Sequence, residues 1–297
     1  MGRFFCACGR TEKRIWESKM AVFESNNASI YYEDTGAGAP VIAVHGLIEN
    51  TAYWSLPGVT ARLAGHYRVI AMDMRGHGRT VTTGDNPGYD ADTVAGDIEA
   101  LADYLGLDRF YLLTHSTGGF AGARWAMEHS DRLAGLVLTD TTSATCPFPG
   151  TPEERVIFFE KFAASFERQT WEEVIAYAKR KPFPFFRGIA EHPDNGAMWD
   201  MALEIIRRGD RNRIAAFVRS FYQDPDMKVE GLRQIRCPVL VLVGEKDDLF
   251  IEPGRVMAEA IPTCRHVVLE GVGHMTAIEA PDRLARELLD FLAACPG

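Results

Sequence analysis

Short apolar runs alternate with amphipathic segments along most of the chain. Six runs are continuous and rich in Val, Ile and Leu, which is typical of strands buried on both faces of a parallel sheet. They read PVIAVHG, YRVIAMDM, FYLLTHS, LAGLVLTD, CPVLVLVGE and RHVVLEGVGH. Residues 90–106, 118–130 and 280–294 carry apolar residues at helical spacing. The alternation predicts an α/β fold, a mostly parallel sheet flanked by helices.

The beginning of the chain follows a different pattern. Residues 1–20 have no clear period, and we interpret them as an appended, disordered tail. From Met20, the stretch MAVFESNNASIYYEDTG predicts two short strands joined by a turn that contains Asn. These two strands bring the expected sheet to eight.

The regular alternation stops in the stretch from 144 to 232. We expect four helices and no strand there, because Pro- and Gly-containing segments such as CPFPG, KPFPFF and EHPDNG separate the helical patterns. The simplest organisation is an α/β core made of residues 21–143 and 233–297. A helical cap, residues 144–232, would be inserted after the sixth strand.

Composition narrows the class of protein without choosing a ligand. A chain of 297 residues that is 46% hydrophobic and 25% charged is ordinary for a globular protein. The formal net charge of -9 argues against a nucleic-acid surface. No apolar run approaches the roughly 18 residues that span a bilayer, and no apolar signal core begins the chain. We therefore expect a cytoplasmic monomer or homodimer that binds a small molecule.

Six cysteines are scattered without the paired spacing of a metal site, apart from Cys6 and Cys8 at the N-terminus. The segment DMRGHGRT is rich in glycine but lacks the spacing of a phosphate-binding loop, so we interpret it as structural. No metal or organic cofactor is expected.

The stretch YLLTHSTGGF carries the main candidate for chemistry. Ser116 leaves a predicted strand and is followed by glycines, as in the nucleophile elbow G-x-S-x-G, although Thr114 replaces the first glycine. Such a turn holds a serine hydroxyl clear of the sheet and aims the backbone N–H of Thr117 at a developing oxyanion. An inert serine on an ordinary strand-to-helix turn is the alternative for this stretch alone.

Two later residues match the partners that a serine nucleophile needs. Asp247 ends the run VLVLVGEKDD, and His274 follows the next predicted strand, in the chain order Ser, Asp, His. The histidine would take the serine proton, and the acid would hold the imidazole in the correct tautomer. Asp248 and Asp140 remain alternatives for the acid.

A binding pocket should lie beside these residues. In the segment VIAVHGLIEN, the backbone N–H of Leu47 is the natural second oxyanion donor, because Gly46 lets the chain turn there. Aromatic residues of the cap would supply an apolar wall. The candidate pocket residues are His45, Phe183, Phe185, Phe186, Trp199 and Met275.

Five segments in order, HGLIENTAYW, DMRGHGRT, THSTGG, VLVGEKDD and GVGHMTAIEAPD, resemble the α/β-hydrolase fold superfamily. The resemblance covers roughly residues 22–146 and 232–295, and is to the branch of small esterases, enol-lactonases, cofactor-free haloperoxidases and carbon–carbon bond hydrolases. It implies that Ser116 is the nucleophile. A serine there argues against dehalogenase or epoxide hydrolase chemistry, because those relatives use a carboxylate nucleophile.

The expected function is a serine hydrolase that cleaves a small or medium apolar carboxylic ester or lactone through an acyl-enzyme. Two alternatives stay open. The same triad could serve a carbon–carbon bond hydrolase or a perhydrolase, and a receptor could retain the triad while only binding its ligand.

Overall fold

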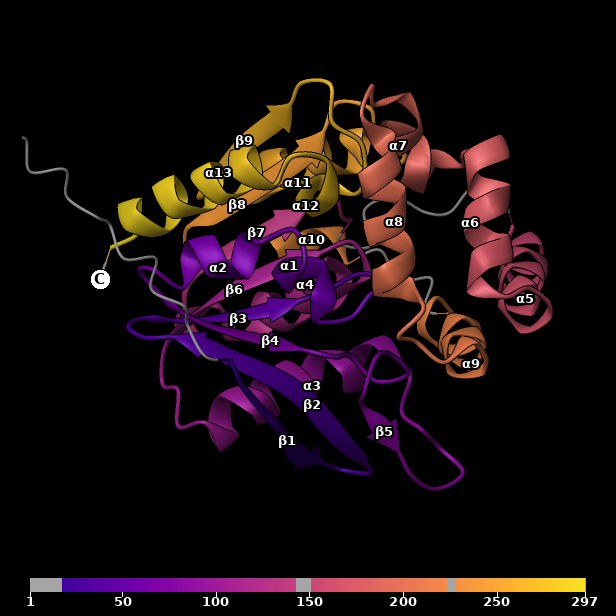
Figure 1. Ribbon diagram of the computed structural model, residues 1–297. Coiled ribbons are helices and arrows are strands. Elements are labelled where there is room, and N and C mark those ends of the chain that lie inside the picture. The colour runs from indigo at the N-terminus through magenta and orange to yellow at the C-terminus, as the bar shows by residue number, and fades with distance from the viewer. Residues whose placement is uncertain (1–17, 143–150, 224–227, 297) are drawn as a thin grey trace, which may run out of the picture.

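In the computed structural model, which describes residues 18–142, 151–223 and 228–296, nine strands form one sheet (Figure 1). The order is β1-β2-β4-β3-β6-β7-β8-β9, and β5 pairs with β2 beside this path. Every pair from β4 through β3 to β9 is parallel. The strands are β1 (Lys19–Ser25), β2 (Ala28–Gly36), β3 (Pro40–Val44), β4 (Arg68–Met72), β5 (Val81–Thr82), β6 (Phe110–His115), β7 (Leu133–Thr139), β8 (Val239–Gly244) and β9 (Cys264–Leu269).

Three details differ from the sequence expectation. The two-residue strand β5 is too short to leave a pattern, and it makes nine strands instead of eight. Strand β9 was expected to be buried on both faces but pairs with β8 alone, so it lies at the sheet edge with Val268 46% exposed. Strand β1 begins at Lys19, inside the expected tail, whereas residues 1–17 lie outside the described residues.

Helices cover both faces of the sheet, and side chains alternate between the two resulting cores. On β3, Val41 and Ala43 pack into one core, and Ile42 and Val44 pack into the other. The first core includes residues of α1 (Ala52–Ser55), α2 (Val59–Leu63), α12 (Thr276–Glu279) and α13 (Pro281–Ala294). The second includes residues of α3 (Ala91–Tyr104), α4 (Thr117–His129) and α11 (Ile251–Ala260).

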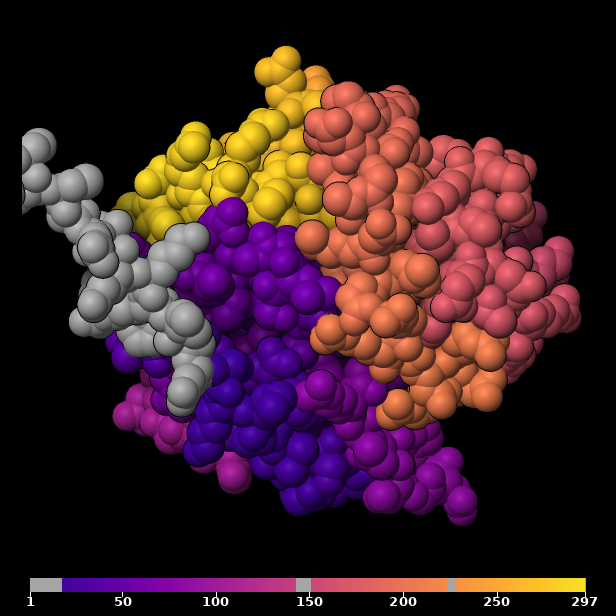
Figure 2. Space-filling model, in the orientation of Figure 1, coloured from indigo at the N-terminus to yellow at the C-terminus, as the bar shows by residue number. Residues whose placement is uncertain are grey.

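Between β7 and β8 the described chain is helical. Four α-helices have ten residues or more, as the sequence pattern predicts, and two shorter α-helices and the 3-10 helix η2 (Pro184–Phe186) add to them. Figure 2 shows this segment, here called the cap (residues 151–223 and 228–232), as a continuous mass against one side of the core. The helices are α5 (Pro152–Arg168), α6 (Trp171–Arg180), α7 (Arg187–Glu191), α8 (Asn195–Ile206), α9 (Arg211–Phe221) and α10 (Val229–Leu232).

No helix of the described chain is long and apolar enough to cross a membrane.

The polar groups of the loop that contains DMRGHGRT make structural hydrogen bonds. Asp73 accepts hydrogen bonds from the backbone N–H groups of Thr51 and Arg79, at 2.6 and 2.8 Å. A Cβ at residue 78 would lie 2.0 Å from the Asp73 carboxylate, so this turn requires Gly78, whose φ is +49°. Burial raises the pKa of Asp73 to about 6. The polar groups of the loop are thus used in joining it to the neighbouring segment.

His77 in this loop should make stability sensitive to acid. Burial lowers the pKa of His77 to about 4, whereas an unfolded imidazole titrates near pH 6.5. As pH falls from about 6.5 toward 4, the unfolded state binds this proton first and stability is lost. Between pH 7 and 5 the loss from His77 should be about 2 kcal/mol, and His77→Asn should remove it. Urea unfolding of wild type and His77→Asn at both pH values measures this effect. If the two proteins lost the same free energy of unfolding between pH 7 and 5, the prediction would be wrong.

Candidate active site

Ser116 lies in a strained turn between β6 and α4. Its φ of 48° and ψ of -118° are costly for a residue with a side chain, and such strain persists only where the surroundings enforce it. The Ser116 N–H donates to the carbonyl of Thr139 at 3.0 Å, and the Thr141 hydroxyl donates to the Ser116 carbonyl at 2.6 Å. Strand β7 therefore fixes the turn, and the Ser116 side chain lies at the carboxyl edge of the sheet.

The turn accommodates Thr114 because the facing helix, α4, has glycine at the positions that approach the strand. The Thr114 hydroxyl donates to the carbonyl of Val137 at 2.8 Å. A Cβ at Gly122 would lie 2.8 Å from the Thr114 methyl group, and a Cβ at Gly118 would lie 2.4 Å from the carbonyl oxygen of His45. Glycine at position 122 of α4 thus leaves room for the larger Thr114 side chain on the strand.

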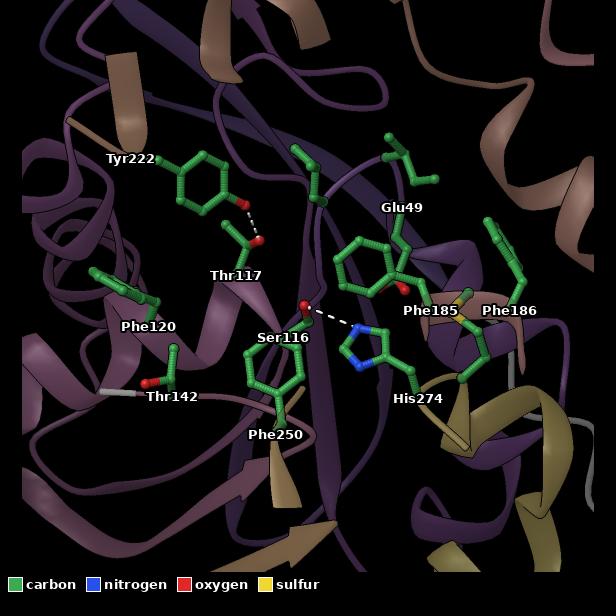
Figure 3. Close-up of a pocket in the computed structure, with 13 residues that line it drawn as sticks. Glu49, Ser116, Thr117, Phe120, Thr142, Phe185, Phe186, Tyr222, Phe250 and His274 are labelled. Atoms are coloured by element: carbon green, nitrogen blue, oxygen red, sulfur yellow. Dashed lines mark hydrogen bonds between the residues drawn. The ribbon is translucent and has the colours of Figure 1, made fainter. Parts of the chain in front are cut away.

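Ser116, His274 and Asp247 come together in a hydrogen-bonded chain. The Ser116 Oγ lies 3.1 Å from His274 Nε2 (Figure 3), and His274 Nδ1 lies 2.7 Å from Asp247 Oδ2. Asp247 is fully buried, and His274 is buried beside it. Since Nδ1 faces a carboxylate, it carries the ring proton and leaves Nε2 free to accept the serine proton.

The two alternative acids occupy other environments. Asp248 is exposed and forms an ion pair with Arg187. Asp140 is fully buried and accepts hydrogen bonds from the N–H of Gly244 at 2.8 Å and from the Thr276 hydroxyl. Burial, and next the charge of Asp247, raises the pKa of Asp140 well above its usual range. Asp140 thus accepts its hydrogen bonds from Gly244 and Thr276 and not from His274.

Two residues that line the cavity have backbone N–H groups without an acceptor in the described chain. Leu47 and Thr117 both line the cavity at Ser116, and neither N–H donates a hydrogen bond to another described residue. Next to Leu47, Ile48 has a φ of 62°, which is an outlier for a β-branched residue. The strained loop after β3 and the elbow after β6 thus present their donors to one cavity.

A second histidine, His115, connects two loops of the site. Glu49 accepts the N–H of Gly46 at 2.6 Å and lies 3.0 Å from His115 Nδ1. His115 Nε2 lies 2.9 Å from the carbonyl oxygen of His274 and must donate to it. The His115 ring therefore connects the loop that contains Glu49 to the backbone of His274. Sequence reasoning missed this pair, although Glu49 lies only two residues after Leu47.

The cavity at Ser116 has a volume of about 60 Å³. Phe185, Phe186 and Met275 line it, as expected, and Phe183 lines a neighbouring cavity. Figure 3 shows the Phe185 and Phe250 rings on either side of His274, with ring centroids 4.9 and 5.1 Å from its imidazole. The lining residues that the sequence did not suggest are Ile48, Glu49, Phe120, Thr142, Tyr222 and Phe250.

Two expected pocket residues are structural instead. The fully buried His45 ring accepts the N–H of Met74 at Nε2, 3.0 Å away, and donates from Nδ1 to the carbonyl of Gly46 at 2.7 Å. Both ring nitrogens are therefore occupied by the backbone. Trp199 is buried in the cap, where its ring centroid lies 5.6 Å from that of Phe186. Neither residue lines the cavity, because backbone groups bind the His45 ring and the Trp199 ring packs inside the cap.

Comparison with known proteins places the chain in a family. A model of the alpha/beta hydrolase fold matches residues 39–281, so the chain belongs to the α/β-hydrolase fold family, as its five motifs indicated. It is 29% identical to a non-heme chloroperoxidase of Kitasatospora aureofaciens, over 90% of this chain and 97% of that protein. It is 26% identical to a fluoroacetate dehalogenase of Burkholderia sp, over 87% and 88%.

Solved structures agree with this assignment. A thermophilic esterase from Thermogutta terrifontis superposes with a TM-score of 0.76 and is 26% identical, over 93% of this chain and 98% of that one. The fold class expected from the sequence is confirmed. Because the relatives include an esterase, a chloroperoxidase and a dehalogenase, membership of the family does not choose the reaction.

The compensation between Thr114 and Gly122 can be tested by stability. Gly122→Ala should destabilise the protein by about 1–3 kcal/mol, since the new methyl group meets the Thr114 methyl. In a Thr114→Ser background, which lacks that methyl, the cost should fall. Gly96→Ala in α3 is the matched control, because a Cβ at residue 96 has no neighbour within 4 Å and should stabilise by about 1 kcal/mol. Urea unfolding measures all four variants; equal costs in both backgrounds would refute the compensation.

Proposed function

We propose that the protein is a serine hydrolase that cleaves a small or medium apolar carboxylic ester or lactone through an acyl-enzyme. The observation that carries this proposal is the hydrogen-bonded chain from Ser116 through His274 to the buried Asp247. It ends at a cavity that the backbone N–H groups of Leu47 and Thr117 also face. Acyl transfer requires a nucleophile, a base that activates it and donors that stabilise the oxyanion.

The proposed reaction begins when Ser116 Oγ attacks the substrate carbonyl carbon and His274 Nε2 takes the hydroxyl proton. The carbonyl oxygen gains negative charge, which the N–H groups of Leu47 and Thr117 stabilise. Asp247 stabilises the imidazolium, and His274 then gives its proton to the departing oxygen. Water attacks the acyl-enzyme with His274 as base, which releases the acid and restores Ser116.

The walls of the cavity support an apolar substrate. Phe120, Phe185, Phe250 and Met275 surround Ser116, and only a few polar groups converge on it. Such a site gains affinity from apolar burial and orients the substrate through the polar groups. The small volume near Ser116 favours a compact group at the reacting carbonyl.

A second candidate is perhydrolase activity, favoured by the likeness to a non-heme chloroperoxidase. Hydrogen peroxide would then replace water as the group that attacks the acyl-enzyme at Ser116, and the product would be a peracid. The choice can be read from the same enzyme preparation, by measuring peracid and free acid side by side from one ester with hydrogen peroxide present.

Ser116→Ala should lower kcat/KM for p-nitrophenyl esters more than about a thousandfold, because no other nucleophile replaces the hydroxyl. Hydrolysis of a series from acetate to decanoate by wild type and variant measures this effect. Full activity in the variant would sink the proposal. Inactivity of the wild type on every ester would instead favour a carbon–carbon bond hydrolase or a ligand receptor.

The identity of the acid can be tested with neighbouring residues. Asp247→Asn should lower kcat/KM by about 10³- to 10⁴-fold, because an amide favours the wrong tautomer of His274. Asp248→Asn, one residue away, is the matched control and should change the rate by less than about twofold, since Asp248 pairs with Arg187 at the surface. The reverse order of effects would assign the acid to Asp248.

A further inference from the structure

A second and larger cavity, of about 740 Å³, lies in the cap next to the triad. Ile48, Phe185 and Phe186 line both this cavity and the small one at Ser116. Its remaining walls come mainly from α5, α6 and the segment 183–186, and they are largely apolar. The two cavities therefore adjoin, and the larger one has room for a long apolar group.

One residue of this lining has no structural explanation. Among the described residues that line the cavity, Arg155 is the only cation and no residue is acidic. Its Nε is buried without a hydrogen-bond partner, and it forms no ion pair within the described chain. A buried donor without an acceptor is costly, so a group that accepts its hydrogen bond would be favoured.

The position of Arg155 in its helix adds to this cost. It lies in the first turn of α5, where the helix dipole favours negative charge and disfavours a cation. Arg187 and Arg219, elsewhere in the cap, each pair with two carboxylates. Neither helix stability nor a salt bridge therefore accounts for an arginine at position 155.

We propose that the cap cavity binds an apolar arm of the substrate that ends in an anionic group, with Arg155 as its counter-ion. This inference rests on the proposed function, because the ester or lactone group would lie at Ser116. Phe185, which lines both cavities, would contact both the reacting group and the arm. Glu49 is among the residues that line the small cavity, whereas no acidic residue is among those that line the larger one, so the end of the substrate nearest Ser116 is the less favourable place for an anion.

Matched ester pairs test the anion site. Monomethyl and dimethyl esters of dicarboxylic acids, from adipate to dodecanedioate, carry the same reacting group with and without a terminal charge. Wild type should prefer the monomethyl ester at one chain length by about tenfold in kcat/KM. Arg155→Met should abolish this preference and Arg155→Lys should retain part of it. Arg168→Met, in the last turn of α5 and outside the lining, removes the same charge and should keep it.

Binding separates the failure of this inference from the failure of the proposed function. Calorimetry with Ser116→Ala should show the monomethyl ester binding about tenfold more tightly than the dimethyl ester, and Arg155→Met in that background should remove the difference. If wild type hydrolyses no ester, this comparison still tests the site. Equal affinities for both esters, or a preference that survives Arg155→Met, would overturn it. Thermal unfolding verifies that each variant folds, and Arg155→Gln replaces Arg155→Met if that variant does not.

Discussion

The site depends on strained backbone at the carboxyl ends of three parallel strands. Ile48 after β3, Ser116 after β6 and Asp140 after β7 all have a φ between 46° and 62°, although none is glycine. Each such residue costs on the order of 1–3 kcal/mol and persists only where its surroundings enforce it. Strands β3, β6 and β7 lie inside the sheet, almost wholly buried and paired on both sides, so their ends have little freedom to relax. The burial that stabilises the sheet therefore also holds the nucleophile in place.

The same burial affects the acidic residues next to His274. Asp140, Asp247 and Glu279 are packed within one region, and burial raises the pKa of both Asp140 and Glu279. Hydrogen bonds from the backbone N–H groups of Gly273 and Met275 to Glu279 offset part of this cost. The carboxyl groups of Asp140 and Glu279 are thus held by hydrogen bonds from their own neighbours, and Asp247 is the acid that contacts His274.

The fold and the meeting of Ser116, Asp247 and His274 at one edge of the sheet were predictable because they follow from local pattern. Continuous apolar runs predict strands inside the sheet, and the order of Ser116, Asp247 and His274 at the ends of such runs brings them to one edge. The pocket was less predictable, since an aromatic residue such as Trp199 packs within the cap or lines a cavity according to distant neighbours. The edge position of β9 and the His115–Glu49 pair likewise depend on pairing between segments far apart in the sequence. The sequence shows that Thr114 replaces the first glycine of the motif, but the close contact between Thr114 and Gly122 is visible only in the folded chain.

Ile48 connects the chemistry to the choice of substrate. It is strained, it follows the oxyanion donor Leu47, and it lines both the cavity at Ser116 and the cavity in the cap. A group bound in the cap cavity would therefore pack against the loop that presents the Leu47 N–H to the reacting carbonyl. Binding energy from a remote part of a substrate accelerates a reaction only if it is used to hold the transition state. Under the proposed function, Ile48 and Phe185 are the residues through which contacts made far from Ser116 would act on the geometry of acyl transfer.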